Sequence, residues 1–388
     1  MINPNPAARR VRRALVPLLG STALVATMFV APTATADEHW KVVASGLDNP
    51  RQLSFGPKGD LFVAEAGRGG EGPCMTGPEG DTVCFGKSGA ITRVSLGKGK
   101  HKGTQQRVLT KLPSVAAQGT AEVPAGSQAI GPHDVVVEGS KKLVFTVGLG
   151  ADPAVRKTEE ALRDMGTLRS ATIGSKKTNL IADIAKHEAR TNPIHDPDSN
   201  PVGFIRHGSG YVVADAGGNT LVDVSKRGRM STRAVFQDQL ALAPPFLGLP
   251  AGTKIPAQAV PTSVAKGPDG ALYVSQLTGF PFEKGLANIY KVDKKGKVSV
   301  YASGLTNVTD LAFGPGNRLY AVQLSTEGLL TGPIGSVVAI PKGGGATHTV
   351  VAQGLFAPYG IAIKGKTAYV TTGSVAPGAG EVIAIPLR

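Results

Sequence analysis

One group of residues in this 388-residue chain combines the side chains needed for proton transfer. His133 stands beside Asp134, and Arg51 occupies a corresponding place in an earlier segment. A histidine next to a carboxylate can move a proton, and a guanidinium can hold an anion, so the group predicts acid–base chemistry. The same residues are also typical of a polar lining that catalyses no reaction, and we favour that interpretation.

A second group has the spacing of a cation site. Asp196, Asp198 and Asn200 alternate along the chain, as the oxygen ligands of a Ca²⁺ loop do. However, Pro201 stands where such a loop has its glycine, and His207 stands where it has its bidentate glutamate. Asp and Asn before proline are also common in turns, so we favour a turn and keep a divalent cation as the alternative.

The elements that carry these residues belong to a repeated hairpin. In its first copy, Leu53 and Phe55 belong to one strand, Gly56-Pro-Lys-Gly59 forms a tight turn, and Leu61 to Ala64 form the next strand. Proline and glycine supply the backbone angles that such a turn requires. Five further copies follow, at Val135–Phe145, Val202–Val213, Val264–Val274, Leu311–Tyr320 and Ile361–Tyr369.

The spacing of the copies predicts a ring of sheets. Their turn glycines are 83, 69, 59, 47 and 51 residues apart, and the shorter values approach the roughly 40 to 50 residues of a four-stranded propeller blade. A third strand follows most hairpins, at Ala90–Val94, Thr220–Val224, Asn288–Val292, Ser336–Ile340 and Glu381–Ile385. We predict an all-β, six-bladed β-propeller formed as a single domain by residues 37–388.

The sixth unit ends after its third strand, so it needs an outer strand from elsewhere. Lys41 to Ala44 have the pattern of that missing strand, and we expect them to close the ring. Residues that open each innermost strand of such a ring face its central channel. The candidate ligand-binding residues are therefore Arg51, His133, Asp134, Asn200, Thr262, Asn307, Asp310 and Tyr359.

The longest insertion lies in blade two. Asp152 as N-cap and Pro153 at the first helical position predict a helix that extends to Met165, and a second helix is expected at about Asn179 to Ala189. These helices could form a rim beside the channel or a cap on exposed blade surface. The sequence leaves both possibilities open.

The first 36 residues have the features of a secretory signal peptide. Four arginines without any acidic residue precede an apolar run from Ala14 to Ala31, and Ala34-Thr-Ala36 forms a cleavage site. A retained membrane anchor is the alternative, and no transmembrane segment is expected after cleavage. We therefore expect a protein that is secreted or held at the cell envelope.

Charge and cysteine content agree with export. The formal charge of +14 falls to +10 without residues 1–36. This basic domain favours anionic partners, although lysines spread over turns are the simpler explanation, and no nucleic-acid-reading motif is visible. Cys74 and Cys84 are the two cysteines, and in an exported protein they most simply form one disulfide. A metal or redox pair is the alternative, but the two lack C-x-x-C spacing.

Several short motifs together resemble the ScyD/ScyE family of exported bacterial proteins. They span essentially the whole chain after residue 36: Gly46–Arg51, Gly131–Asp134, Asp196–Pro201, Asp215–Asn219, Val260–Ser263 with Gly267–Gly270, and Leu277–Phe282. The resemblance implies an exported propeller but names no reaction, because the activity of that family is not established. It therefore supplies no catalytic residues.

More distantly, the hairpins resemble NHL and gluconolactonase-type propellers. Lactonases of that type bind a divalent metal through a Glu, two Asn and an Asp, and here Asn200, Asn307 and Asp310 are available without the Glu. We therefore expect a monomeric binding or scaffolding protein whose partner is a small molecule or an envelope component. A metal-dependent hydrolase that uses the channel face is the alternative.

Overall fold

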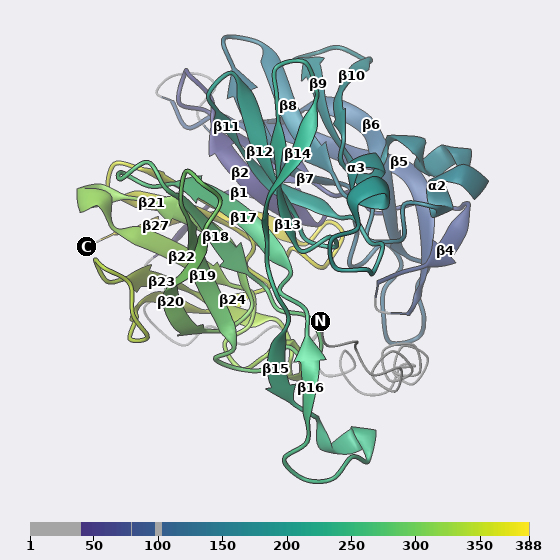
Figure 1. The fold of residues 1–388 in the computed structure, drawn as a ribbon. Coiled ribbons are helices and arrows are strands. Elements are labelled where there is room, and N and C mark those ends of the chain that lie inside the picture. The colour runs from purple at the N-terminus through teal and green to yellow at the C-terminus, as the bar shows by residue number, and fades with distance from the viewer. Residues whose placement is uncertain (1–39, 79, 98–102, 388) are drawn as a thin grey trace.

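A computed structural model describes residues 40–78, 80–97 and 103–387. The predicted signal peptide lies outside the described residues. The described residues form six large antiparallel sheets and one two-stranded sheet (Figure 1). In five of the six large sheets the strands follow one another closely along the chain, as the repeated hairpins predict, and the sixth takes one strand from the N-terminal part of the chain.

The first three large sheets cover the N-terminal half. The first contains β2 (Pro50–Phe55), β3 (Leu61–Glu65), β4 (Cys74–Thr76), β5 (Thr82–Val94) and β6 (Gln105–Ala117). The second contains β7 (Pro132–Glu138), β8 (Lys142–Val147), β9 (Thr167–Thr172) and β10 (Thr178–Asp183). The third contains β11 (Pro201–His207), β12 (Gly210–Asp215), β13 (Thr220–Val224) and β14 (Met230–Val235).

The other three large sheets cover the C-terminal half. The fourth contains β17 (Pro261–Lys266), β18 (Leu272–Gln276), β19 (Ala287–Val292) and β20 (Val298–Leu305). The fifth contains β21 (Val308–Phe313), β22 (Leu319–Gln323), β23 (Ile334–Ile340) and β24 (Thr349–Phe356). The sixth contains β25 (Ile361–Lys364), β26 (Thr367–Thr372), β27 (Gly380–Pro386) and β1 (Lys41–Leu47).

The N-terminal strand completes the sixth sheet. β1 runs antiparallel to β27, with Lys41 opposite Ala384 and Val42 opposite Ile383. This confirms the predicted pairing and extends the strand to Leu47. The edge of β27 is therefore covered by a strand from the other end of the described chain.

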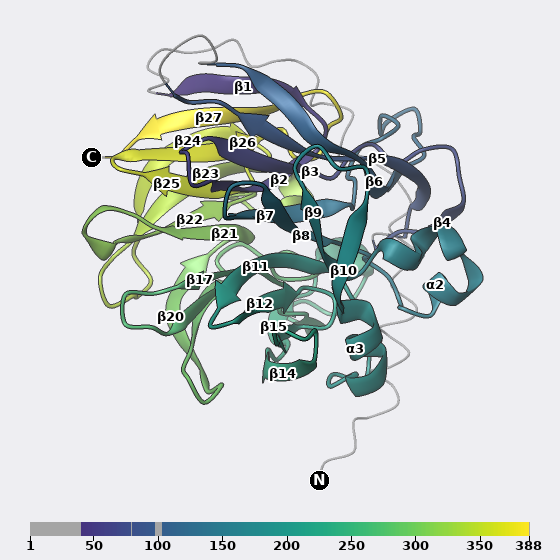
Figure 2. The same cartoon turned by 90° about the horizontal axis from the view of Figure 1, so that it is seen from above.

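The innermost strands arrange the large sheets into a ring. β2 contacts β7, β7 contacts β11, β11 contacts β17, β17 contacts β21, β21 contacts β25, and β25 contacts β2. Seen from above, the colours follow one another around the molecule in chain order (Figure 2). This is the arrangement of a β-propeller.

The core lies between neighbouring sheets. Phe62 of the first sheet and Phe145 of the second belong to one apolar cluster, and Tyr320 of the fifth sheet shares another with Val370 of the sixth. The second strand of most sheets is buried on both faces, as in β3 and β22. A strand covered on both faces needs a nearly continuous apolar run, which explains the sequences of these strands.

The helical insertion differs from the prediction. In place of one long helix, the segment forms α2 (Val155–Thr158) and the 3₁₀ helix η2 (Glu160–Asp164), because Glu159 between them is extended, with φ −118° and ψ 93°. The second predicted helix starts late. β10 occupies Thr178–Asp183 by pairing with β9, and α3 (Ile184–Thr191) begins only after Asp183, whose side chain accepts a hydrogen bond from the Lys186 N–H.

Between the third and fourth sheets, the chain forms a hairpin that the sequence did not predict. It consists of β15 (Gln239–Leu242), the 3₁₀ helix η3 (Pro245–Leu247) and β16 (Lys254–Ala257). Two further 3₁₀ helices lie in the connections of the fifth sheet, η4 (Pro315–Asn317) between β21 and β22 and η5 (Leu329–Thr331) between β22 and β23. No helix within the described ranges is long and apolar enough to span a membrane.

The predicted disulfide is confirmed. Cys74 and Cys84 are bonded and lie opposite each other where β4 pairs with β5. The bond fastens the long loop after β3 to the third strand of its sheet.

Candidate functional site

The predicted channel residues lie where the innermost strands begin, and most of them are buried. The exposed fraction is 7% for Arg51, 3% for His133 and 0% for Asn307. Asp134, Thr262, Asp310 and Tyr359 are buried as well, and Asn200 is half-buried. Their hydrogen-bond partners therefore decide what these side chains can do.

Gln52 crosses the centre of the ring. Its Nε2 donates to the carbonyl oxygen of Thr262 at 3.0 Å and to that of Thr309 at 3.2 Å, although β17 lies opposite β2 in the ring. Glycines make room for this side chain. A Cβ at Gly203 would lie 2.8 Å from Gln52 Oε1, and a Cβ at Gly360 would lie 2.6 Å from Gln52 Cα. The channel is therefore filled by protein at this level.

Arg51 binds backbone and an aromatic ring. Nη1 donates to the Ser374 carbonyl at 3.0 Å, Nη2 donates to the Ala129 carbonyl at 2.5 Å, and the guanidinium carbon lies 4.7 Å from the centre of the Tyr359 ring. Burial lowers the pKa of Arg51. The side chain links the loops of the sixth and second sheets to β2, and the aromatic face stabilises its charge.

His133 and Asp134 do not work as a pair in this structure. His133 Nδ1 lies 3.3 Å from the Pro201 carbonyl oxygen, and burial, together with the nearby Arg51 charge, lowers its pKa to about 3. Asp134 accepts hydrogen bonds from the Val135 N–H at 2.7 Å and the Phe204 N–H at 3.0 Å, and burial raises its pKa. The carboxylate thus connects β7 to β11.

Asp310 has the same role on the opposite side of the ring. Oδ1 accepts from Ser263 Oγ at 2.6 Å and from the Leu311 N–H at 2.8 Å, while Oδ2 accepts from the Ile361 N–H at 2.8 Å. Burial raises its pKa to about 7. Thr262 makes a related contact, because its Oγ1 donates to the Val308 carbonyl at 2.8 Å. These side chains hold neighbouring innermost strands together.

The asparagines bind nearby loops. Asn307 Nδ2 donates to the Leu277 carbonyl at 2.8 Å, and Asn200 Oδ1 accepts from the Leu149 N–H at 3.3 Å. In the proposed Ca²⁺ array, Asp196 Oδ2 accepts from Gln258 Nε2 at 3.1 Å. Across the residues that the structure describes, no three His, Cys, Asp or Glu side chains are placed to hold a metal ion.

Sequence reasoning missed a set of polar residues at the end of the second strand in several sheets. Glu65 Oε2 accepts from the Asp48 N–H at 2.8 Å, Asp215 Oδ1 from the Asn200 N–H at 2.6 Å, and Gln323 Oε1 from the Thr306 N–H at 2.7 Å. Each fixes the loop that leads into an innermost strand. Their recurrence at one place in the repeat was the signal that could have found them.

Three carboxylates gather around the Gly217–Gly218 backbone. A Cβ at Gly218 would lie 2.7 Å from Glu188 Oε2 and 3.3 Å from Asp215 Oδ2, and a Cβ at Gly217 would lie 2.7 Å from Asp198 Oδ1. Burial is the largest cause, and repulsion between the carboxylates the second, of a pKa that is raised to about 8 for Glu188 and to about 7 for Asp198. Burial also raises the pKa of Asp215 to about 6. Near neutral pH, this cluster therefore retains protons.

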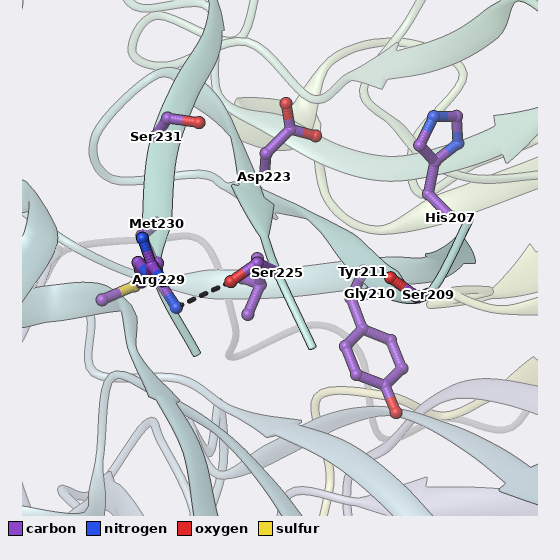
Figure 3. Close-up of a pocket in the computed structure, with 10 residues that line it drawn as sticks. His207, Ser209, Gly210, Tyr211, Asp223, Ser225, Arg229, Met230 and Ser231 are labelled. Atoms are coloured by element: carbon purple, nitrogen blue, oxygen red, sulfur yellow. Dashed lines mark hydrogen bonds between the residues drawn. The ribbon is translucent and has the colours of Figure 1, made fainter. Parts of the chain in front are cut away.

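Two shallow depressions lie away from the channel. The larger, of about 310 Å³, is lined by the ends of β11 to β14 and includes His207, Tyr211, Asp223 and Arg229. Figure 3 shows Tyr211 and Asp223 pointing in opposite directions, and Tyr211 Oη donates to Glu138 at 2.9 Å. The smaller depression, of about 210 Å³, lies beside Glu65 and Arg107. Tyr211 and Asp223 in the larger depression do not converge, and in the smaller one Glu65 and Arg107 pair with each other at 2.7 Å, so neither depression presents a converging group that is free to meet a substrate.

Comparisons with known proteins identify the fold. No family model matches the chain, and no curated protein matches it. A gluconolactonase from Xanthomonas campestris superposes with a TM-score of 0.52 at 11% identity, over 89% of each chain. Virginiamycin B lyase from Staphylococcus aureus gives a TM-score of 0.44 at 12% identity, over 90% of this chain and 100% of the lyase.

A third similar structure is the nidogen/laminin complex, with a TM-score of 0.42 at 15% identity over 75% of this chain and 84% of the matched chain. The likeness to the gluconolactonase, at 11% identity, indicates the fold and not an activity. The likeness to the gluconolactonase agrees with the closed ring of innermost strands. The chain is a β-propeller.

Proposed function

We propose that this chain is a secreted, six-bladed β-propeller of the ScyD/ScyE type that acts as a binding or scaffolding protein at the cell envelope or outside the cell. Each of the six large sheets is one blade, and the β15–β16 hairpin is an insertion between blades three and four. Residues 1–36 are the signal peptide, and 37–388 form the mature domain. Its partner is a small molecule or an envelope component, and the mature protein is a monomer.

The use of the channel side chains supports a binding role most strongly. Gln52, Asp134 and Asp310 form hydrogen bonds with backbone groups of other blades. A hydrolase needs polar groups that are free to meet a substrate and a pocket in which they converge. Side chains committed to joining blades do not supply such groups, whereas a rigid ring is a suitable platform for surface contacts.

Metal analysis with an activity assay tests this role against that of a gluconolactonase-like hydrolase. We expect the purified mature protein to hold no stoichiometric metal, to show no change in Tm with Ca²⁺, Zn²⁺ or Mn²⁺, and to leave a sugar lactone unhydrolysed. One ion per chain that disappears in Asn307→Ala, together with lactone turnover, would overturn the proposal. Asn179→Ala is the matched control, because Asn179 is exposed on β10.

A further inference from the structure

The β15–β16 hairpin presents apolar side chains to solvent. The exposed fraction is 62% for Leu240, 50% for Leu242, 60% for Phe246 and 39% for Leu249. Figure 1 shows the hairpin extending beyond the large sheets, with its tip farthest from them. Alternation along β15 buries Ala241 and leaves its two leucines on the open face. These four residues form what we call the apolar tip.

Part of the backbone of the hairpin is paired within the hairpin itself. The Ala243 N–H donates to the Thr253 carbonyl at 2.9 Å, the Leu247 N–H to the Pro244 carbonyl at 3.1 Å, and the Gly248 N–H to the Pro245 carbonyl at 3.1 Å. Prolines at positions 244, 245, 250 and 256 have no N–H to satisfy. The hairpin thus pairs part of its backbone internally, and a contact in the interface, unlike a span of the hydrocarbon core, leaves its other N–H groups within reach of water and headgroups.

The charge of the segment also fits a lipid surface. Residues 239–257 contain no Asp or Glu and a single cation, Lys254, which lies opposite Leu242 in the strand register. Without residues 1–36, which hold four arginines and no acidic residue, the formal charge of +14 becomes +10. Apolar side chains next to a cation on a basic protein complement a bilayer that contains anionic headgroups.

Contacts at its base hold the hairpin in place. Gln239 Nε2 donates to Gln276 Oε1 at 3.0 Å, and the Leu242 N–H donates to Glu283 Oε2 at 2.8 Å. At the tip, the Phe246 ring lies 6.3 Å from that of Phe280 in the loop after β18, measured between centroids. Because the Leu242 N–H is already occupied, this edge of β15 is less suited to adding a strand from a protein partner.

We propose that the apolar tip is a membrane-binding element that places Phe246 and Leu249 in the interface of a bilayer with anionic headgroups. This inference rests on the proposed binding role and names its partner. The ring of large sheets stays in water, because the hairpin extends beyond it. The membrane contact is peripheral, since a few apolar side chains bind reversibly.

Vesicle sedimentation of the mature protein tests the inference. We expect binding to phosphatidylcholine vesicles that contain phosphatidylglycerol, and at least about a tenfold weaker affinity for the double variant Phe246→Ser with Leu249→Ser. The control is Val300→Ser with Val350→Ser, which removes apolar side chains that are 58% and 54% exposed on β20 and β24. Control and wild type should bind alike, and all three proteins should have similar Tm values.

A fluorescent probe gives an independent measurement. The single variant Phe246→Trp should shift its emission to the blue on addition of the anionic vesicles, by more than the wild type with its native Trp40 does. Absence of vesicle binding by the wild type overturns the inference, as does equal binding by the hairpin variant. A dimer that depends on Phe246 without any vesicle binding also overturns it, in favour of self-association. None of these outcomes bears on metal content or lactone hydrolysis, which test the proposed function separately.

Discussion

Replacement of Glu188 by glutamine should stabilise the protein at alkaline pH and leave its stability in mild acid almost unchanged. The Glu188 side chain is 1% exposed, and its Oε1 has no hydrogen-bond partner among the described residues. The side chain lies on α3. Burial is the largest reason that its ionisation is disfavoured, and the nearby carboxylates of Asp215 and Asp198 oppose that ionisation further. The folded protein therefore keeps this carboxyl protonated at a pH at which the unfolded chain has lost the proton.

The sign of the effect follows from proton binding. Because the pKa of Glu188 rises from 4.5 to about 8 on folding, the folded state binds more protons than the unfolded state between those values. The contribution to stability is complete below about pH 4.5 and is lost as the pH rises through about 8. Each pKa unit corresponds to about 1.4 kcal/mol, so the full difference is about 5 kcal/mol. Local opening that admits water reduces this loss, and we expect Glu188→Gln to recover about 2 kcal/mol at about pH 9.

Thermal melting across pH measures the effect. At about pH 9 the Glu188→Gln variant should melt about 3 °C above the wild type, and at about pH 4 the two should coincide. Glu160→Gln is the control, because that side chain is 85% exposed and its removal should not change the pH dependence. An unchanged pH dependence of Tm in Glu188→Gln would refute the argument. Equal gains in both variants would also refute it, because they would indicate a general charge effect.

Two further predictions concern the closure of the ring and the ion pairs beside it. Leu47→Ala on β1 should lower the free energy of unfolding by about 2 to 4 kcal/mol in urea denaturation, because that side chain is 1% exposed. Val42→Ala, at 44% exposure on the same strand, should lower it by under about 0.5 kcal/mol. Equal losses would contradict the closing role of β1. Arg107→Met should lower the free energy of unfolding by about 2 to 4 kcal/mol. The substitution removes the cation that pairs with fully buried Glu65 at 2.7 Å. Arg68→Met removes a guanidinium that is 55% exposed, so it should lower the free energy of unfolding by under about 1 kcal/mol. A larger loss for Arg68→Met than for Arg107→Met would show that the burial of Glu65 does not set the size of the effect.

Much of the fold was predictable because its signals are local. Alternating apolar residues and Gly-Pro turns act between strands that are neighbours in sequence, and they located β13 at Thr220–Val224 with no error in its bounds. The pairing of β1 with β27 was predictable because the repeat showed which strand was missing. The interrupted helix at Glu159 was not predictable, since the capping signals around Asp152 and Gly166 describe the ends of a segment and not its middle.

The sequence by itself determined the repeated hairpins, the disulfide and the polar residue types at the start of each innermost strand. Only the tertiary structure decided what those polar residues do. Arg51 donates to the carbonyl of Ser374, which lies 323 residues away, and Asp134 accepts from Phe204 in the next sheet. Periodicity cannot specify such partners, because ring closure brings together strands from opposite ends of the chain. For the same reason, the gathering of Glu188, Asp198 and Asp215 around two glycines became visible only in the folded protein.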